Sequence, residues 1–500
     1  MRLWAVVFLA GAATLSVEIS ASRLLAPFFG SSTVVWANVI GLILVYLSVG
    51  YWFGGKLADR SPHAALLGRI ILVAAAAIAV IPFVARPFLD TTVQELDTAS
   101  LGAAVGSFFA ALALFAVPVT LLGTVSPFAI RLSLPTVENA GSVSGRLYAL
   151  STIGSILGTF CAAIVAIPFA GTQRTMIGTA VLLAVAAGLL LGLRWQVLAV
   201  AFAALLAVPP GAIKSGLLYE AESRYQYVDV RQESDGARVL ELNEGVVANS
   251  LWYPGSVLTG GEWDMFVVVP PLVSHPAHRV LVLGNAGGST ARALTALYPH
   301  VSVDGVEIDP TVTAAARRFL GLGRIPRLHV ITADARAYLR STKKRYDVIA
   351  IDVYRQPYIP FQVTTREFFS EVRSHLTPGG CVALNVARLP HDRGLLDAIA
   401  ATIRSELGQA WDWDALRFNS LLFACRGPVT RAELVHRARA VPAPAKSLLP
   451  LFRRGVYATG FHGTVLTDDR APVEWLSDRA IVSYVAHGGR LQHEHLPTRP

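Results

Sequence analysis

The stretch RVLVLGNAGGSTARALTALYPHVSVDGVEIDP, residues 279–310, decides the fold of the second half of the chain. It opens with an apolar run at 280–283 that is typical of a buried strand. A helical pattern follows at 289–297, and a second apolar run occupies 301–306. The order of these segments predicts a βαβ unit.

The turn between the first strand and the helix contains three glycines, Gly284, Gly287 and Gly288. Glycines allow the backbone to approach a ligand closely. Glu307 ends the second strand about 20 residues later, where an acid can accept hydrogen bonds from both ribose hydroxyls of a nucleotide. We therefore predict that this unit binds a nucleoside cofactor; the alternative is a plain structural turn.

Two further predicted strands also end on acids. The run at 329–332 precedes Asp334, and the run at 346–351 precedes Asp352. Strands that alternate with helices predict a parallel, doubly wound sheet, which binds ligands at the carboxyl ends of its strands. Glu307, Asp334 and Asp352 should then share one edge of the sheet, although solvated loop acids are the simpler alternative.

Two smaller patterns give structural predictions. Residues 364–367 (Thr-Thr-Arg-Glu) have capping-box spacing and should open a helix at Glu367. The three cysteines, Cys161, Cys381 and Cys425, are far apart and lack metal-ligand spacing. We interpret them as packing residues and predict no metal site.

The composition indicates a membrane protein. Of 500 residues, 53% are hydrophobic, and the apolar excess is concentrated before about residue 212. The net charge of +9 favours an anionic membrane surface, and the chain has no nucleic-acid motif. The predicted membrane spans are 3–19, 34–53, 64–84, 101–122, 147–169, 176–193 and a shorter one at 195–208.

Three domains are predicted: a transmembrane domain at 1–210, a small antiparallel β subdomain at 211–268, and a Rossmann-like domain at 269–490. Arginines and a lysine flank the second and fourth connections between spans, which places these connections and the N-terminus in the cytoplasm. Six spans would keep the soluble part in the cytoplasm, as we expect, and seven would export it. The short last segment leaves the side open.

The soluble half resembles spermidine synthase, a polyamine aminopropyltransferase on the class I methyltransferase fold. The whole chain resembles bacterial fusions of a transporter-like membrane half to a spermidine synthase-like half. The segment 54–60 (GGKLADR) adds a partial similarity to a loop of major facilitator transporters. The resemblance implies a multi-pass membrane protein, a small-molecule amine as substrate, and no nucleic-acid partner, with a homodimer as an open alternative.

The resemblance also implies a cofactor, decarboxylated S-adenosylmethionine or S-adenosylmethionine itself, and no metal. Gly284, Gly287 and Gly288 would then lie beside its methionine-derived part. Glu307 would hold the ribose, and Asp334 with Ala335 would contact the adenine.

The resemblance assigns the acceptor side to three residues. Gln226, together with Tyr225, would contact the amine substrate, and Asp352 would accept its proton. A diamine such as putrescine is mostly protonated near neutral pH, so a carboxylate must attract the cation and take its proton before the amine can attack.

Two departures from the family pattern keep other functions open. Arg355 stands where the family has a second acid, and residues 262–264 (Glu-Trp-Asp) replace its Tyr-His-Glu gate. The expected activity is aminopropyl transfer to a diamine. The alternatives are an S-adenosylmethionine-dependent methyltransferase of another substrate, and a transporter or sensor that binds a nucleoside without turnover.

Overall fold

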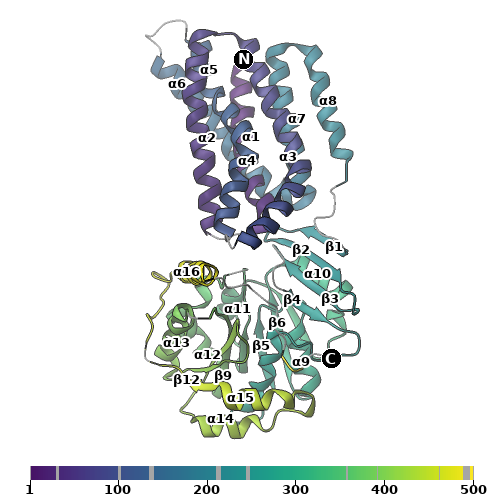
Figure 1. Ribbon diagram of the computed structural model, residues 1–500, viewed down its shortest axis with the longest axis vertical. Coiled ribbons are helices and arrows are strands. Elements are labelled where there is room, and N and C mark those ends of the chain that lie inside the picture. The colour runs from purple at the N-terminus through teal and green to yellow at the C-terminus, as the bar shows by residue number, and fades with distance from the viewer. Residues whose placement is uncertain are drawn as a thin grey trace. The chain divides into compact units, whose positions relative to one another are not determined.

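The computed structural model describes residues 2–29, 33–99, 103–134, 140–209, 216–243, 248–355, 358–390, 392–460, 462–487 and 496–498. These residues form two compact units (Figure 1). The first unit comprises Met1–Ser215 and Ala221–Tyr227, and the second comprises Gly216–Glu220 and Val228–Pro500.

The first unit is a bundle of helices (Figure 1). Its elements are α1 (Arg2–Phe29), α2 (Thr33–Arg60), α3 (Ala64–Ala99), α4 (Ala103–Gly123), α5 (Val125–Ser133), α6 (Ala140–Phe160), the π-helix η2 (Cys161–Ala166), α7 (Ile167–Leu191), α8 (Gln196–Ala204) and two short 3₁₀ turns, η3 (Leu193–Trp195) and η4 (Leu205–Ala207). Among the residues that the structure describes, five helical stretches are long and apolar enough to cross a membrane.

The last of these stretches, Ala140–Leu191, contains 52 residues, about twice what one crossing needs. Gly171 breaks its helical path with φ 83° and ψ 164°. This break separates the fifth and sixth predicted spans, because only glycine adopts such a backbone conformation readily. The predicted seventh span corresponds to a shorter apolar helical segment, Leu193–Ala207.

Small residues allow α6 to pack closely on α1. A Cβ atom on Gly154 would lie 2.2 Å from the carbonyl oxygen of Phe8, and one on Gly158 would lie 2.1 Å from that of Ala12. Both glycines are therefore required for the backbones to approach, as small residues often are between helices in a membrane.

The second unit begins with a four-stranded sheet in the order β1-β2-β3-β4. The strands are β1 (Leu217–Glu222), β2 (Tyr227–Gln232), β3 (Arg238–Leu242) and β4 (Ala248–Trp252). The pairs β2–β3 and β3–β4 are antiparallel, as predicted for this region. The first strand, β1, was not predicted.

The main sheet has eight strands in the order β12-β10-β11-β9-β8-β5-β6-β7. They are β5 (Arg279–Leu283), β6 (Ser302–Glu307), β7 (Leu328–Thr332), β8 (Tyr346–Ile351), β9 (Leu376–Ala387), β10 (Trp411–Trp413), β11 (Asn419–Cys425) and β12 (Val456–Ala458). The five strands from β9 to β7 are parallel, and β11, β10 and β12 continue the sheet as antiparallel neighbours. This order confirms the predicted Rossmann-like, class I methyltransferase fold.

Apolar side chains from both faces of this sheet form two separate cores. Val280 and Val282 of β5 belong to one core, and Leu281 and Leu283 belong to the other. The covering helices are α9 (Ser289–Leu297), α10 (Pro310–Phe319), α11 (Ala335–Ser341), α12 (Arg366–His375), α13 (Gly394–Leu407), α14 (Arg431–Ala438), α15 (Leu449–Gly455) and α16 (Val473–Ala486). The strongly apolar strands thus have helices and loops on both sides, as a parallel sheet requires.

Two sequence predictions were wrong. Cys381 and Cys425 are not simple packing residues but form a disulfide, because the β9–β11 register places them directly opposite each other. The N-cap of α12 is Thr365, whose side chain accepts from the N–H of Phe368. Glu367 instead accepts from the N–H of Asp468, so no capping box forms there.

Candidate functional site

The site lies where four neighbouring parallel strands end. The strands β7, β6, β5 and β8 are adjacent in the sheet, so their carboxyl ends meet at one edge. The chain continues from these ends into Asp334, Glu307, Gly284 and Asp352, respectively. The N–H of Ala333 donates to the carbonyl of Glu307 (3.1 Å), and that of Asp352 donates to the carbonyl of Leu283 (2.8 Å).

The glycine turn is held tightly between its neighbours. Gly284 has φ 85°, and a Cβ atom there would lie 2.2 Å from the carbonyl oxygen of Asp352. Gly287 donates its N–H to the hydroxyl of Ser250 (2.8 Å), which leaves no room for a side chain. Gly288 has φ 81° and precedes the first residue of α9. All three glycines are therefore required by the conformation of this turn.

Glu307 is buried at the end of β6, with 7% of its surface exposed. Its Oε2 accepts from the N–H of Ala286 (2.9 Å), and its Oε1 accepts from the N–H of Asp309 (3.0 Å). The N–H of Ile308 also stabilises the carboxylate, which has four acceptor lone pairs in all. Burial raises the pKa of Glu307 to about 7, although these N–H donors counteract the rise. A ligand with two hydroxyl donors would complete this arrangement.

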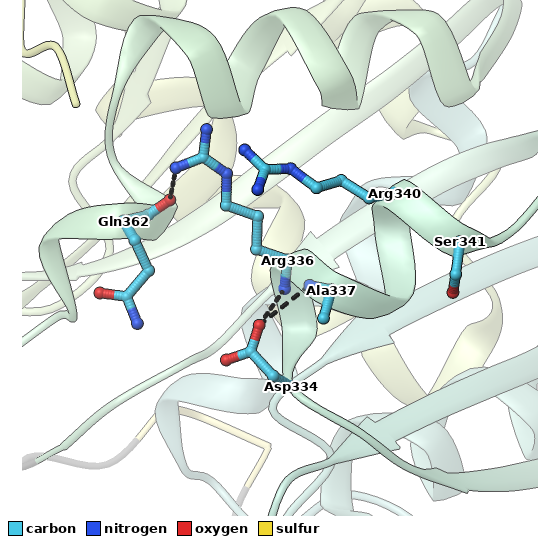
Figure 2. A pocket seen from close by; sticks show the side chains of 6 residues that line it. All are labelled: Asp334, Arg336, Ala337, Arg340, Ser341 and Gln362. Atoms are coloured by element: carbon cyan, nitrogen blue, oxygen red, sulfur yellow. Dashed lines mark hydrogen bonds between the residues drawn. The ribbon is translucent and has the colours of Figure 1, made fainter.

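Asp334 is the N-cap of α11. Its Oδ1 accepts from the N–H groups of Arg336 (3.0 Å) and Ala337 (2.9 Å), as Figure 2 shows. The groove beside it has a volume of about 570 Å³ and is also lined by Arg340, Ser341 and Gln362. Glu307 and Asp352 do not line this groove, and Ala335, the other predicted adenine contact, is buried.

Asp352 accepts a hydrogen bond from the first of two amide side chains that are hydrogen-bonded in series. Its Oδ1 accepts from Nδ2 of Asn385 (3.0 Å), whose Oδ1 accepts from Nδ2 of Asn419 (3.0 Å). Burial raises the pKa of Asp352 to about 6, and the bond from Asn385 limits the rise. The carboxylate is therefore mostly ionised at neutral pH yet is a better proton acceptor than an exposed aspartate.

Another carboxylate, Glu262, was not predicted as a site residue. It begins the 3₁₀ helix η5 (Glu262–Val268). Burial, and the nearby negative charge of Asp352, raise the pKa of Glu262 to about 8. Burial, and then the negative charges of Asp352 and Glu262, raise the pKa of the Tyr354 phenol. No spacing between residues 262 and 352 along the chain indicates a link between them.

The predicted amine contacts fall in the first unit. Tyr225 is exposed, Gln226 is buried, and both belong to Ala221–Tyr227 in the first unit, so their substrate role stays a prediction. The side chain of Arg355 is exposed, and its backbone pairs with that of Tyr358. Among the residues that the structure describes, no group of three or more His, Cys, Asp or Glu side chains could hold a metal ion.

Comparison with known proteins finds a family model, curated relatives and solved structures. Residues 264–404 match a family model described as a spermine/spermidine synthase domain. A probable polyamine aminopropyl transferase of Bifidobacterium longum (strain NCC 2705) is 32% identical over 295 residues, which cover 55% of this chain and 65% of that protein. A polyamine aminopropyltransferase of Vibrio vulnificus (strain CMCP6) is 35% identical over 138 residues, covering 27% of this chain and 45% of that protein.

A solved structure also aligns with the chain. It is a spermidine synthase in complex with the transition state analogue AdoDATO, with a TM-score of 0.38 and 21% identity. The alignment covers 45% of this chain and 78% of that one. The chain spans less than two thirds of the length of either curated relative.

Proposed function

We propose that the protein is a membrane-anchored aminopropyltransferase. It transfers an aminopropyl group from decarboxylated S-adenosylmethionine to an amine such as putrescine. The observation that carries this proposal is the placement of Glu307 and Asp352 on either side of a tight glycine turn, within the segment that matches the spermine/spermidine synthase model. The five long apolar helical stretches support the membrane location.

The residues around the turn fit the proposed co-substrate. Glu307 is a buried carboxylate acceptor at the end of β6, which suits the hydroxyls of a ribose. Asp334 with Ala335 would contact the adenine. When bound, the co-substrate supplies a carbon activated by its positively charged sulfur.

Asp352 would prepare the acceptor amine. In its ionised form it attracts the ammonium group and takes one proton, which leaves a lone pair on nitrogen. The nitrogen then forms a bond to the activated carbon, and the carbon–sulfur bond breaks with its electron pair going to sulfur. The relay from Asn419 through Asn385 fixes the carboxylate in one orientation, which this in-line attack requires.

One observation favours a second candidate, an S-adenosylmethionine-dependent methyltransferase. Arg355 is a cation at the position where the resemblance implies a second acid, so the acceptor could carry less positive charge than a diamine. The same cofactor-binding residues would serve both reactions.

Purified full-length protein in detergent separates the two candidates. It is incubated with putrescine and either decarboxylated or intact S-adenosylmethionine, and products are measured by mass spectrometry. We expect spermidine from the decarboxylated form and none from the variant Asp352→Asn. A methylated product without spermidine would refute aminopropyl transfer and favour the methyltransferase.

A further inference from the structure

Two asparagines on neighbouring strands lie behind Asp352, the proposed proton acceptor. Asn385 is on β9 and is 2% exposed, and Asn419 is the first residue of β11. In the antiparallel register, Asn385 is opposite Leu421 and Asn419 is opposite Ala387. The two asparagines are therefore diagonal neighbours on one face of the sheet, where side chains reach each other. The pairing of β9 with β11 thus places the two amide groups together.

The amide group of Asn385 has one orientation that satisfies both of its neighbours. Its Nδ2 donates to Oδ1 of Asp352 (3.0 Å), and its Oδ1 accepts from Nδ2 of Asn419 (3.0 Å). A carboxylate only accepts hydrogen bonds, whereas an amide has a donor end and an acceptor end. If Asn385 were turned over, two oxygens would face each other at Asp352 and two NH₂ groups at Asn419. The donor that Asn419 presents therefore decides which end of Asn385 faces the acid.

The loop that carries Asp352 is fastened on both sides. The Tyr354 hydroxyl donates to the backbone carbonyl of Asn385 (3.1 Å) and accepts from the N–H of Ala387 (2.7 Å). The N–H of Asp352 donates to the carbonyl of Leu283 at the end of β5 (2.8 Å). Because these bonds hold residues 352–354 against β5 and β9, the orientation of the Asn385 amide decides which atom the carboxylate meets.

The end of the amide that faces Asp352 affects how readily this acid ionises. Among the residues that the structure describes, Asn385 is the one side chain that donates a hydrogen bond to Asp352. This bond lowers the pKa of Asp352 and counteracts the effect of burial. The titratable groups whose pKa responds to the charge of Asp352 are Glu262 of η5 and Tyr354. An amide oxygen in place of the NH₂ group would favour the protonated acid, which cannot take a proton from an amine.

We propose that Asn419 and Asn385 are positioning residues for proton transfer. Asn419 sets the orientation of the Asn385 amide, and Asn385 thereby keeps Asp352 in the ionised form that accepts the proton of the amine. This inference rests on the proposed aminopropyl transfer. It assigns a role in the reaction to Asn419, a residue on the antiparallel part of the sheet that acts through two successive hydrogen bonds.

The variant Asn419→Asp tests this role with almost no change in shape. Its carboxylate only accepts, so it should turn the NH₂ of Asn385 toward itself and the oxygen of Asn385 toward Asp352. We expect the pH at which kcat is half-maximal to rise by about one unit from the wild-type value of about 6. Such a shift lowers kcat at pH 6 about fivefold and leaves kcat at pH 8 nearly unchanged. Spermidine formation by the full-length protein in detergent, at saturating putrescine and decarboxylated S-adenosylmethionine, measures kcat.

A double variant separates amide orientation from the added negative charge. Asn385→Leu removes the amide and should raise the midpoint of the kcat profile by itself. Adding Asn419→Asp to Asn385→Leu should give no further shift, because no amide remains to be turned. An equal shift with and without Asn385 would mean that the charge acts directly and would overturn the inference. Asn419→Leu removes the donor without adding charge and should shift the midpoint in the same direction by less.

Two controls separate these results from general damage to the sheet. Ser420→Ala changes the next residue of β11, which faces the opposite side of the sheet. The Ser420 hydroxyl is buried and has no hydrogen-bond partner among the described residues, so this variant should keep the wild-type pH profile. Every variant should bind methylthioadenosine like the wild type in calorimetry, because the glycine turn and Glu307 are unchanged.

The outcomes distinguish this inference from the proposed function. If Asn419→Asp and Asn419→Leu both keep the wild-type pH profile, the inference is wrong while aminopropyl transfer stands. A loss of kcat by the same factor at every pH would also contradict it, since a structural defect does not move the midpoint. A wild type that makes no spermidine would overturn both.

Discussion

The variant Glu307→Gln tests the cofactor site most directly. Each oxygen of Glu307 accepts one backbone N–H, the N–H of Ile308 also stabilises the carboxylate, and we expect the ribose hydroxyls to donate to it as well. A hydrogen bond to a charged group contributes about 1.5–3 kcal/mol. Glutamine has one oxygen, so it loses one of the two ribose bonds and turns an NH₂ group toward a backbone N–H. The loss should reach about 2.7 kcal/mol, or about 100-fold in affinity.

Isothermal titration of methylthioadenosine into the detergent-solubilised full chain measures this loss. The pH dependence gives a second readout, because burial raises the pKa of Glu307 to about 7. Ribose hydroxyls donate to the ionised form, so the wild-type affinity should rise as the pH increases from about 6 to 8 and then level off. The variant has no carboxylate to ionise, and its affinity should not follow this curve.

Glu433→Gln is the matched control, since it makes the same chemical change at an exposed acid outside the site. Binding by Glu307→Gln within threefold of the wild type would refute the ribose assignment. A wild-type affinity that is constant between pH 6 and 8 would refute the role of ionisation.

Three further predictions concern the rest of the chain. The variant Asp468→Ala removes two hydrogen bonds to the guanidinium of Arg336 (2.7 and 2.8 Å), a residue that is 7% exposed. Glu371 still pairs with Arg336, and Asp468 is partly exposed. We therefore expect the free energy of unfolding to fall by about 1–2 kcal/mol, measured as a lower Tm. Gly158→Leu should reduce the yield of monodisperse protein on size exclusion, because even a Cβ atom would lie 2.1 Å from the Ala12 carbonyl; Gly141→Leu, at an open position, is its control. The rate kcat should rise as the pH increases through about 6, where Asp352 ionises, and a rate that falls over this range would contradict its role as proton acceptor.

Local patterns predicted the central part of the fold well. The helix at 289–297 and the strand at 346–351 match α9 and β8, because their apolar spacing and flanking turns are decided by neighbouring residues. The same local pattern predicted that a strand ends at Glu307. The antiparallel strands β10 and β12, with three residues each, were missed because such short segments have no periodic pattern of their own.

Contacts between residues that are far apart along the chain could not be predicted from the sequence. The two halves of the cysteine pair are 44 residues apart, and only the register of β9 with β11 brings them together. The sequence likewise does not relate Glu262 to Asp352, because only the folded sheet connects the segments that carry them. Asp352 by itself could be predicted from its place directly after a strand. Thr364 and Thr365 have the same side chain, so the sequence does not say which of them is the N-cap of α12. The distant Asp468 decides this, because it hydrogen-bonds with both Thr365 and Glu367.

The bond between Cys381 and Cys425 can report on which side of the proposed membrane the second unit lies. Disulfides persist in oxidising compartments, whereas cytosolic reductants keep cysteines as thiols. Alkylating intact cells with a maleimide polymer before and after reduction would show in which state these two sulfurs are held. Oxidised sulfurs would place the second unit outside the cytosol, and the proposed reaction would then need its amine and nucleoside there. Free thiols would place this unit, and the proposed reaction, in the cytosol.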